Sequence, residues 1–123
     1  MKRVLDVGQC NPDHASIRSL LEGQFGAEVV RAHQLNDALA QLGSGKFDLV
    51  LVNRKLDIDY TDGMDIIKHL QADPQFKSIP VMLVTNYPEH DQVAVAAGAT
   101  SGFGKAQLQE PGTREKLARI LGH

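Results

Sequence analysis

The sequence predicts an α/β fold in which a parallel sheet is covered on both faces by helices. Along the whole chain, short continuous apolar runs alternate with segments whose apolar residues recur at the spacing of a helix. The apolar runs also lack the alternation of a half-exposed strand, as expected when helices cover both faces of a parallel sheet. Together these two observations indicate strand–helix units in sequence.

The first half of the chain supplies three strands and two helices. Strands are expected at 4–7, 28–31 and 49–52. The first helix should begin with Asn11 as N-cap and Pro12 at the first helical position, and should end at Gly26. Asn36 is a candidate cap of the second helix. The apolar faces consist of Ile17, Leu20, Leu21 and Phe25 in the first helix and of Leu35, Leu39 and Leu42 in the second.

The second half continues the alternation. Strands are expected at 81–84 and, more weakly because of two glycines, at 101–104. The inward residues are Met64, Ile67 and Leu70 in the third helix, Val93, Ala96 and Ala97 in the fourth, and Leu117, Ile120 and Leu121 in the fifth. Five such units predict a flavodoxin-like doubly wound sheet with strand order 2-1-3-4-5, flanked by five helices. Residues 1–123 are expected to form a single domain.

Composition excludes several functional classes. Thirteen basic and 15 acidic residues give a formal net charge of -2, which argues against nonspecific binding of nucleic acid. No apolar run is long enough to span a bilayer, so no membrane partner is expected. Cys10 is the single cysteine, which excludes an intramolecular disulfide and fits a reducing cytoplasm. A cytoplasmic location is therefore predicted.

Polar residues follow several of the predicted strands. Gly8 and Gln9 follow the first strand, Asn53 follows the third and Thr85 the fourth. Lys105 follows the fifth strand. In a doubly wound sheet, ligands bind beyond the carboxyl ends of the strands, near the switch point between strands 1 and 3. The sequence therefore predicts that these five residues meet in one crevice.

Four segments give the chain a family resemblance. They are DLVLVN around Asn53, DGMDIIKHLQ at the start of the third helix, IPVMLVTN ending near Thr85, and AAGATSGFGK ending at Lys105. With these segments the chain resembles, over essentially its whole length, a receiver domain of two-component response regulators. The resemblance implies a domain of a phosphorelay system. In this family a phosphoryl group is transferred, with the help of Mg²⁺, to an aspartate at the end of strand 3.

The chain departs from that pattern at the reacting positions. Asn53 occupies the phosphoacceptor position, and Gly8 and Gln9 occupy the acidic pair that would hold Mg²⁺. A carboxamide is a poor nucleophile, and Mg²⁺ gives up water reluctantly without carboxylates. Gly102 replaces the aromatic switch residue, and only Thr85 and Lys105 remain of the phosphate-binding set. The resemblance is therefore to a pseudo-receiver, with no catalytic residue, metal or cofactor expected and no enzymatic turnover.

The expected function is a phosphorylation-independent interaction with a protein, either a histidine kinase or a downstream effector. In the family the usual partner surface is helix 4, strand 5 and helix 5. Here that surface carries His90, Asp91, Gln92, Gln109, Glu110, Arg114, Lys116 and Arg119. Two alternatives remain open: a sensor of small anions or metabolites that uses Lys55, Thr85 and Lys105, and phosphotransfer through a non-standard acceptor such as Asp57.

Two acidic features are left with a structural explanation. Asp57, Asp59 and Asp62 lack the spacing of a calcium loop, so the segment is expected to cap the third helix. Asp6 lies in the middle of the central strand, where an unpaired carboxylate is costly. It either pairs with Arg31 or His33 on the neighbouring strand or lies in partial solvent.

Overall fold

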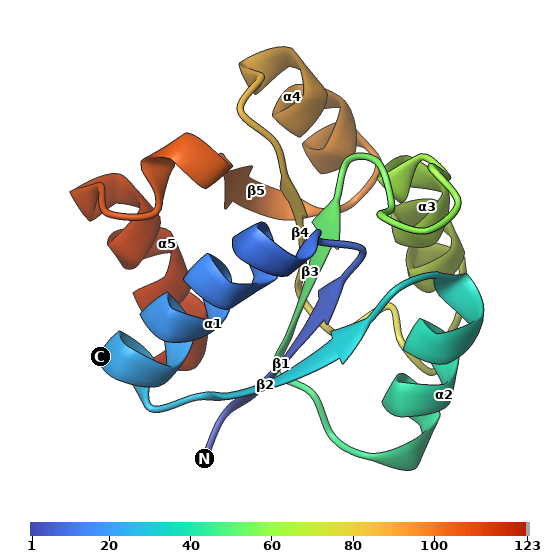
Figure 1. Cartoon of the computed structure of the whole chain (residues 1–123). Coiled ribbons are helices and arrows are strands. Elements are labelled where there is room, and N and C mark those ends of the chain that lie inside the picture. Colours follow the sequence, from blue (N-terminus) through green and yellow to red (C-terminus); the bar gives the residue numbers. More distant parts are fainter. Residues whose placement is uncertain (123) are drawn as a thin grey trace.

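The computed structural model describes residues 1–122 and shows a doubly wound α/β fold (Figure 1). Its sheet has five strands in the order β2-β1-β3-β4-β5. The strands are β1 (Arg3–Val7), β2 (Glu28–Ala32), β3 (Leu49–Asn53), β4 (Val81–Val84) and β5 (Thr100–Phe103). The helices are α1 (Asn11–Phe25), α2 (Leu35–Ser44), α3 (Gly63–Ala72), α4 (Pro88–Ala96) and α5 (Pro111–Leu121), with a 3-10 turn, η1, at Lys105–Gln107. The predicted fold class, strand order and number of helices are confirmed.

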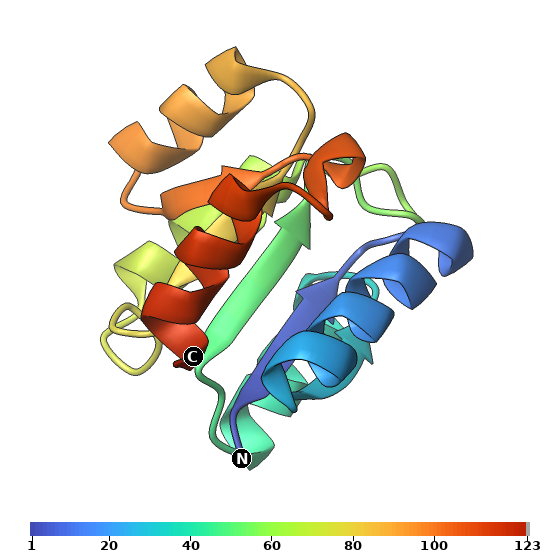
Figure 2. The ribbon, with the colours of Figure 1, turned by 90° about the vertical axis from the view of Figure 1, so that its left-hand side faces the viewer.

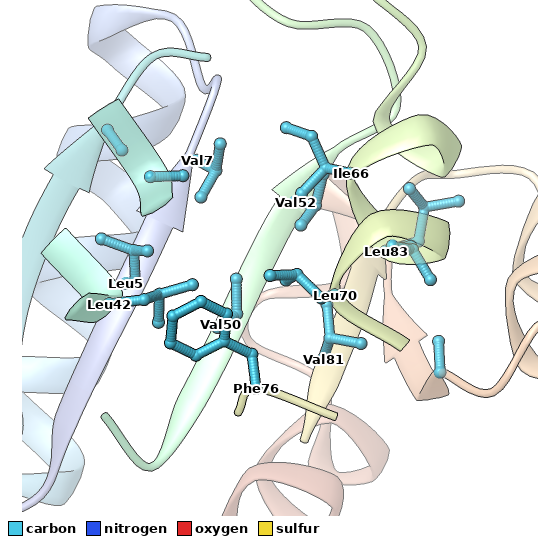
Figure 3. Close-up of a cluster of buried hydrophobic side chains, with 14 of the residues drawn as sticks. Leu5, Val7, Leu42, Val50, Val52, Ile66, Leu70, Phe76, Val81 and Leu83 are labelled. Atoms are coloured by element: carbon cyan, nitrogen blue, oxygen red, sulfur yellow. The ribbon is translucent and has the colours of Figure 1, made fainter. Parts of the chain in front are cut away.

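Helices cover both faces of the sheet, as Figures 1 and 2 show. All four strand pairs are parallel. Successive residues of a strand point to opposite faces of the sheet and so enter two different cores. Leu5 and Val50 pack in the core under α2 and α3, which Figure 3 shows. Val4 and Leu49 pack in the core under α1 and α5. Leu49 to Val52 are all fully buried, which explains why this strand shows no alternation in the sequence.

Three expectations about helix caps and faces were wrong. The N-cap of α1 is Cys10 rather than Asn11, because Asn11 already lies in the first turn. The N-cap of α2 is Gln34 rather than Asn36, and Asp37 accepts hydrogen bonds from the backbone N–H groups of Gln34 and His33. A capping box built from Gln and Asp is less typical than one that begins with Ser or Thr, so the sequence pattern pointed elsewhere.

The third error concerns the buried face of α4. Ala94 is its buried residue, whereas Val93 and Ala96 are exposed and Ala97 is half-buried. The helix is short and begins at Pro88, and alanine and valine occupy several of its faces. Helical spacing therefore could not identify the inward side. The end of α1 was predicted correctly, at Gly26 in the left-handed conformation.

Among the described residues no helix is long and apolar enough to cross a bilayer. Because the strands are parallel, their carboxyl ends meet at one edge of the sheet. The β1–α1 connection, the β3–α3 loop and the segment after β5 leave the sheet at that edge (Figures 1 and 2). This edge holds the residues that the sequence singled out.

Candidate functional site

Asn53 closes the end of β3 with its side-chain amide. The Asn53 Nδ2 group donates one hydrogen bond to the Gly8 carbonyl at 3.0 Å and another to the Lys55 carbonyl at 2.7 Å. These carbonyls belong to two different loops, one after β1 and the other after β3. Both hydrogens of the carboxamide are used, so the side chain joins the two loops at the switch point of the sheet.

The space beside Gly8 is filled by the side chain of Leu56. Gly8 has a φ of 78°, a left-handed conformation that side chains rarely adopt. A β-carbon at Gly8 would collide with Leu56 Cδ2, and Leu56 is 1% exposed. The apolar side chain of Leu56 therefore occupies the space into which a residue at position 8 would extend. The neighbouring Gln9 is fully buried, and neither its side-chain nitrogen nor its oxygen has a hydrogen-bond partner.

Thr85 and Lys105 reach the same edge but point to different partners. The Thr85 hydroxyl lies 3.2 Å from His90 Nδ1 on α4 and accepts a hydrogen bond from the Tyr87 N–H. The Lys105 ammonium lies 2.7 Å from Asp13 in the first turn of α1. Burial acts to raise the pKa of Asp13, but the bonds from Lys105 and from the Cys10 thiol hold it below its ordinary value. Among the described residues, the hydrogen bonds of the Asn53 side chain go to Gly8 and Lys55, and not to Thr85 or Lys105.

A second polar group joins β2 to the β3–α3 loop. Arg31 donates from Nη2 to the Gln9 carbonyl at 2.9 Å, and the same nitrogen lies 3.7 Å from the Asp57 carboxylate. His33 Nδ1 approaches Asp57 at 3.0 Å. Asp57 therefore points to β2, between a guanidinium and an imidazole, and it is already engaged. Lys55 is exposed at the base of the loop.

Both predictions for Asp6, a bond to Arg31 or His33 and partial exposure to solvent, were wrong. The side chain is fully buried, which excludes partial solvent, and its Oδ2 atom lies 2.7 Å from His14 Nδ1 on α1 rather than bonding Arg31 or His33. Burial raises the pKa of Asp6 to about 6, against the opposing effects of His14, Gln9 and Arg31. The Gln9 carboxamide is thus near enough to act on Asp6, although it makes no hydrogen bond of good geometry.

The outer edge of β5 carries a clamp between two helices. Asp91 on α4 accepts hydrogen bonds from the Gly102 N–H and the Ser101 hydroxyl, both at 2.8 Å. Lys116 on α5 donates to the Gly102 carbonyl at 2.8 Å. A β-carbon at Gly102 would collide with the Leu83 carbonyl oxygen, so this position has no room for a side chain. Two of the surface residues predicted for partner binding, Asp91 and Lys116, are therefore used inside the domain.

The predicted partner surface keeps an apolar part. Tyr87 is 59% exposed, Val93 57% and Val95 44%, all on α4 or at its N-cap. Of the eight polar residues predicted there, the exposed ones are Gln92, Gln109, Glu110, Arg114 and Arg119. A separate open groove of about 790 Å³ lies between α1 and η1, and Gln109 and Glu110 line it.

The acidic β3–α3 loop behaves as expected from the sequence. The Asp62 side chain accepts a hydrogen bond from the Met64 N–H and caps α3. Hydrogen bonds from the backbone and side chain of Thr61 lower the pKa of Asp59. Within the described residues no group of His, Cys, Asp and Glu side chains could hold a metal ion. The loop is thus a helix cap and a turn.

Comparison with known proteins identifies the family. The model of the response regulator receiver domain matches residues 13–110. This chain therefore belongs to the response regulator receiver domain family of two-component signalling.

Relatives from several bacteria agree with this assignment. The chemotaxis protein CheY of Pseudomonas aeruginosa is 26% identical over 120 residues, which cover 97% of this chain and 95% of that protein. CheY-3 of Vibrio cholerae is 30% identical over 85 residues, or 68% of this chain and 64% of that protein. The structure of CheY4 of Vibrio cholerae has a TM-score of 0.77 at 26% identity, covering 98% of this chain and 99% of that one.

A further structure supports the fold alone. The signal receiver domain of a DNA-binding response regulator from Colwellia psychrerythraea aligns over the full length of both chains, with a TM-score of 0.83 at 21% identity.

Receiver domains interact in general with histidine kinases and effectors.

Sequence reasoning missed the residues that hold the edge of the sheet together. His14, Leu56 and Asp91 were not identified as neighbours of Asp6, Gly8 and Gly102. The pairing of β1 with β2 places Asp6 opposite Arg31, and the sequence did suggest this proximity. The contacts of His14 and Leu56 depend on how α1 and the β3–α3 loop lie on the sheet, and no short sequence pattern reports that.

Proposed function

We propose that this receiver domain works in two-component signalling as a phosphorylation-independent interaction module, with no phosphoryl transfer through position 53. The observation that carries the proposal is the hydrogen bonding of Asn53. Its nitrogen is tied to the Gly8 and Lys55 carbonyls, and a carboxamide nitrogen so placed is neither a nucleophile nor a ligand for a cation. The end of β3 therefore serves to join two loops.

The environment of Asn53 supports the same conclusion. Phosphoryl transfer depends on electrostatic stabilisation of the transferring group, which Mg²⁺ and its carboxylates normally supply. Here Leu56 fills the space over Gly8, and Gln9 contributes an uncharged side chain. The Lys105 ammonium is neutralised by Asp13. No enzymatic activity is proposed, because position 53 carries a carboxamide in place of a nucleophilic carboxylate.

The two alternatives find less support in the geometry. A small-anion sensor would need Lys55, Thr85 and Lys105 to converge on a ligand. Lys55 is exposed on the β3–α3 loop, whereas the Thr85 hydroxyl bonds to His90 and the Lys105 ammonium to Asp13. An acceptor role for Asp57 would need an accessible carboxylate, whereas that side chain is 16% exposed and paired with His33 and Arg31. Both groups have structural partners that a ligand would have to displace.

The partner surface proposed is the exposed side of α4, next to β5 and α5. Tyr87 at the N-cap of α4 and Val93 and Val95, which lie on either side of the buried Ala94, expose apolar area on this helix, and exposed apolar area is typical of protein interaction sites. The clamp on Gly102 fixes α4 and α5 to the edge of β5. A protein partner, either a histidine kinase or an effector, would therefore meet a surface that is already formed.

The first test is incubation of the protein with a small acyl phosphate and Mg²⁺, followed by intact-mass measurement. We expect no added phosphoryl group, whereas a receiver that ends β3 with aspartate, treated in parallel, should be labelled. Labelling of the wild-type chain would contradict the proposal. The variant Asp57→Asn then decides whether Asp57 is the acceptor, since label lost in that variant would establish the alternative.

The second test measures binding to a panel of histidine kinases and response-regulator effectors. We expect affinity to be unchanged by the acyl phosphate and reduced by about tenfold or more in the double variant Val93→Ser, Val95→Ser. Gln24→Ser is the control, because Gln24 is an exposed polar residue of α1, outside the proposed surface. Binding that appears only after treatment with the phosphoryl donor would contradict a phosphorylation-independent module.

A further inference from the structure

The contacts of Asn53 define an unusual arrangement of charge. One nitrogen atom with two hydrogens stands between the Gly8 carbonyl and the Lys55 carbonyl, at 3.0 and 2.7 Å. Two carbonyl oxygens that face one point need a positive partner, which can be an N–H group or a cation. In this chain the partner is part of the protein.

We propose that Asn53 is a built-in latch, which replaces a bound cation and holds the β1–α1 and β3–α3 loops together without any ligand. The inference deepens the proposed function and rests on it for its biological meaning, because a crevice latched in this way would not respond to phosphorylation or to Mg²⁺. The latch itself is a property of the structure.

Two further contacts strengthen the same closure. Leu56, from the β3–α3 loop, packs on Gly8 of the β1–α1 connection. Arg31 bonds the Gln9 carbonyl on one side and approaches Asp57 on the other. A hydrogen-bonded amide, an apolar contact and a guanidinium therefore join the same two loops, and none of the three depends on a ligand.

The latch also fixes what the β3–α3 loop presents to solvent. The loop turns back on itself through hydrogen bonds from the Leu56 N–H to the Thr61 carbonyl and from the Tyr60 N–H to the Leu56 carbonyl. Tyr60 has a φ of 58°, a conformation that is costly for a residue other than glycine and persists only where its surroundings enforce it. Ile58 and Tyr60 are 56% and 73% exposed at the tip. Anchoring the base of the loop keeps this tip in one position.

Aspartate at position 53 would reverse the sign of the interaction. It would place a carboxylate oxygen where the amide nitrogen now lies, facing the same two carbonyl oxygens. Lys105 is held by Asp13 and Arg31 by Gln9 and Asp57, and Lys55 offers its backbone carbonyl to this point while its residue is exposed to solvent. The variant should therefore require a cation from solution to close the loops, and the three oxygens would then be its ligands.

The experiment compares the thermal stability of wild type and Asn53→Asp in EDTA and across a titration with magnesium chloride, at ionic strength held constant with sodium chloride. The wild type should melt at the same temperature throughout. Asn53→Asp should melt roughly 5–15 °C lower in EDTA and recover part of the loss as Mg²⁺ saturates the site. Amide exchange of Leu56 and Tyr60 should be faster in the variant in EDTA and slower again with Mg²⁺.

Asn86→Asp is the matched control. It makes the same change of charge at the end of the neighbouring strand, but there the side-chain oxygen accepts a hydrogen bond from the Ala106 N–H at 3.0 Å. Aspartate preserves that acceptor, so the control should melt close to the wild type and show no dependence on Mg²⁺.

Three outcomes decide the proposal. Loss of stability in Asn53→Asp that Mg²⁺ restores supports the latch. Stability equal to that of the wild type in EDTA would overturn it, and so would a loss that Mg²⁺ does not restore. Failure here is separate from failure of the proposed function, which depends on the acyl phosphate and binding tests of the wild-type protein.

Discussion

The crevice at the ends of β1 and β3 and the surface of α4, β5 and α5 use polar side chains in different ways. In the crevice, Asn53, Leu56 and Arg31 join one loop to another and fill the space that a ligand would need. On the surface, Asp91 and Lys116 secure the edge of β5 from either side, while apolar residues of α4 remain exposed beside them. The crevice is therefore filled by the protein's own side chains, whereas the surface of α4, β5 and α5 is held in place and still exposes apolar residues.

The difference bears on how a signal would cross the domain. Coupling between two sites requires an element with two arrangements whose balance both sites influence. Here the Thr85 hydroxyl is bonded to α4 through His90, and position 102 has no room for a moving side chain. The closed crevice and the open surface are therefore expected to behave independently, and three changes test that expectation.

The largest effect is expected from Gly8→Asp, which returns an acidic residue to the crevice. The new β-carbon would collide with Leu56, and the backbone at this position has a positive φ. Together the overpacking and the backbone strain should lower the free energy of unfolding by about 3–5 kcal/mol. Denaturant titration measures the loss, and near-UV dichroism shows whether the fold survives.

Gly112→Asp provides the control for adding a carboxylate to a glycine. Nothing lies within 4 Å of a β-carbon there, and Gly112 is in the first turn of α5, where a negative charge is favourable. Its stability should equal or slightly exceed that of the wild type. If Gly8→Asp were tolerated equally well, the crevice would be open rather than filled. Restoring the acidic pair together with Asn53→Asp would then be a practical route to phosphorylation.

The next effect concerns pH and the buried pair of Asp6 and His14. The folded protein raises the pKa of Asp6 from 3.8 to about 6, so it binds this proton more tightly than the unfolded chain does. Below about pH 3 both states are protonated, and Asp6 imposes no penalty. As pH rises through 6 the folded state must bury a carboxylate, which costs about 3 kcal/mol relative to low pH.

The variant Asp6→Asn removes this titration and keeps a polar side chain beside His14. We expect the stability of the wild type relative to Asp6→Asn to fall by about 3 kcal/mol as pH rises from 3 to 7, as measured by urea unfolding at each pH. A difference that stays constant with pH would mean that Asp6 titrates at its ordinary pKa. Asp91→Ala, on the other face, should not alter this pH dependence.

The sequence was sufficient for the fold because the fold depends on repeated apolar patterns. Leu49 to Val52 indicate a strand buried on both faces whatever surrounds them, and Gly26 and Asp73 end helices through local chemistry. The caps at Cys10 and Gln34 were missed because neither is a preferred N-cap, and the outward side of α4 because its apolar residues are not confined to one face.

The site was predictable in its positions but not in its contacts. Parallel strands bring Gly8, Asn53, Thr85 and Lys105 to one edge, and the sequence placed them there. Which partner each side chain takes depends on tertiary distances, such as the 2.7 Å between Lys105 and Asp13 or between Asp6 and His14. The strand ends that reach this edge were therefore predictable, whereas the partners of Asn53, Thr85 and Lys105 became visible only in three dimensions.

The smallest effect is expected from Asp91→Ala, which removes one side of the clamp on β5. The Gly102 N–H would lose its acceptor at the edge of the sheet, and leaving a buried donor unpaired costs about 1–2 kcal/mol. Gln92→Ala, the exposed neighbour on α4, should change stability by less than about 0.5 kcal/mol. In hydrogen exchange, Gly102 and the amides of α4 should lose protection in Asp91→Ala, while Gly63 and Leu56 keep theirs. Faster exchange at Gly63 and Leu56 as well would show that the clamp and the crevice are coupled, and that the two regions form one switchable unit after all.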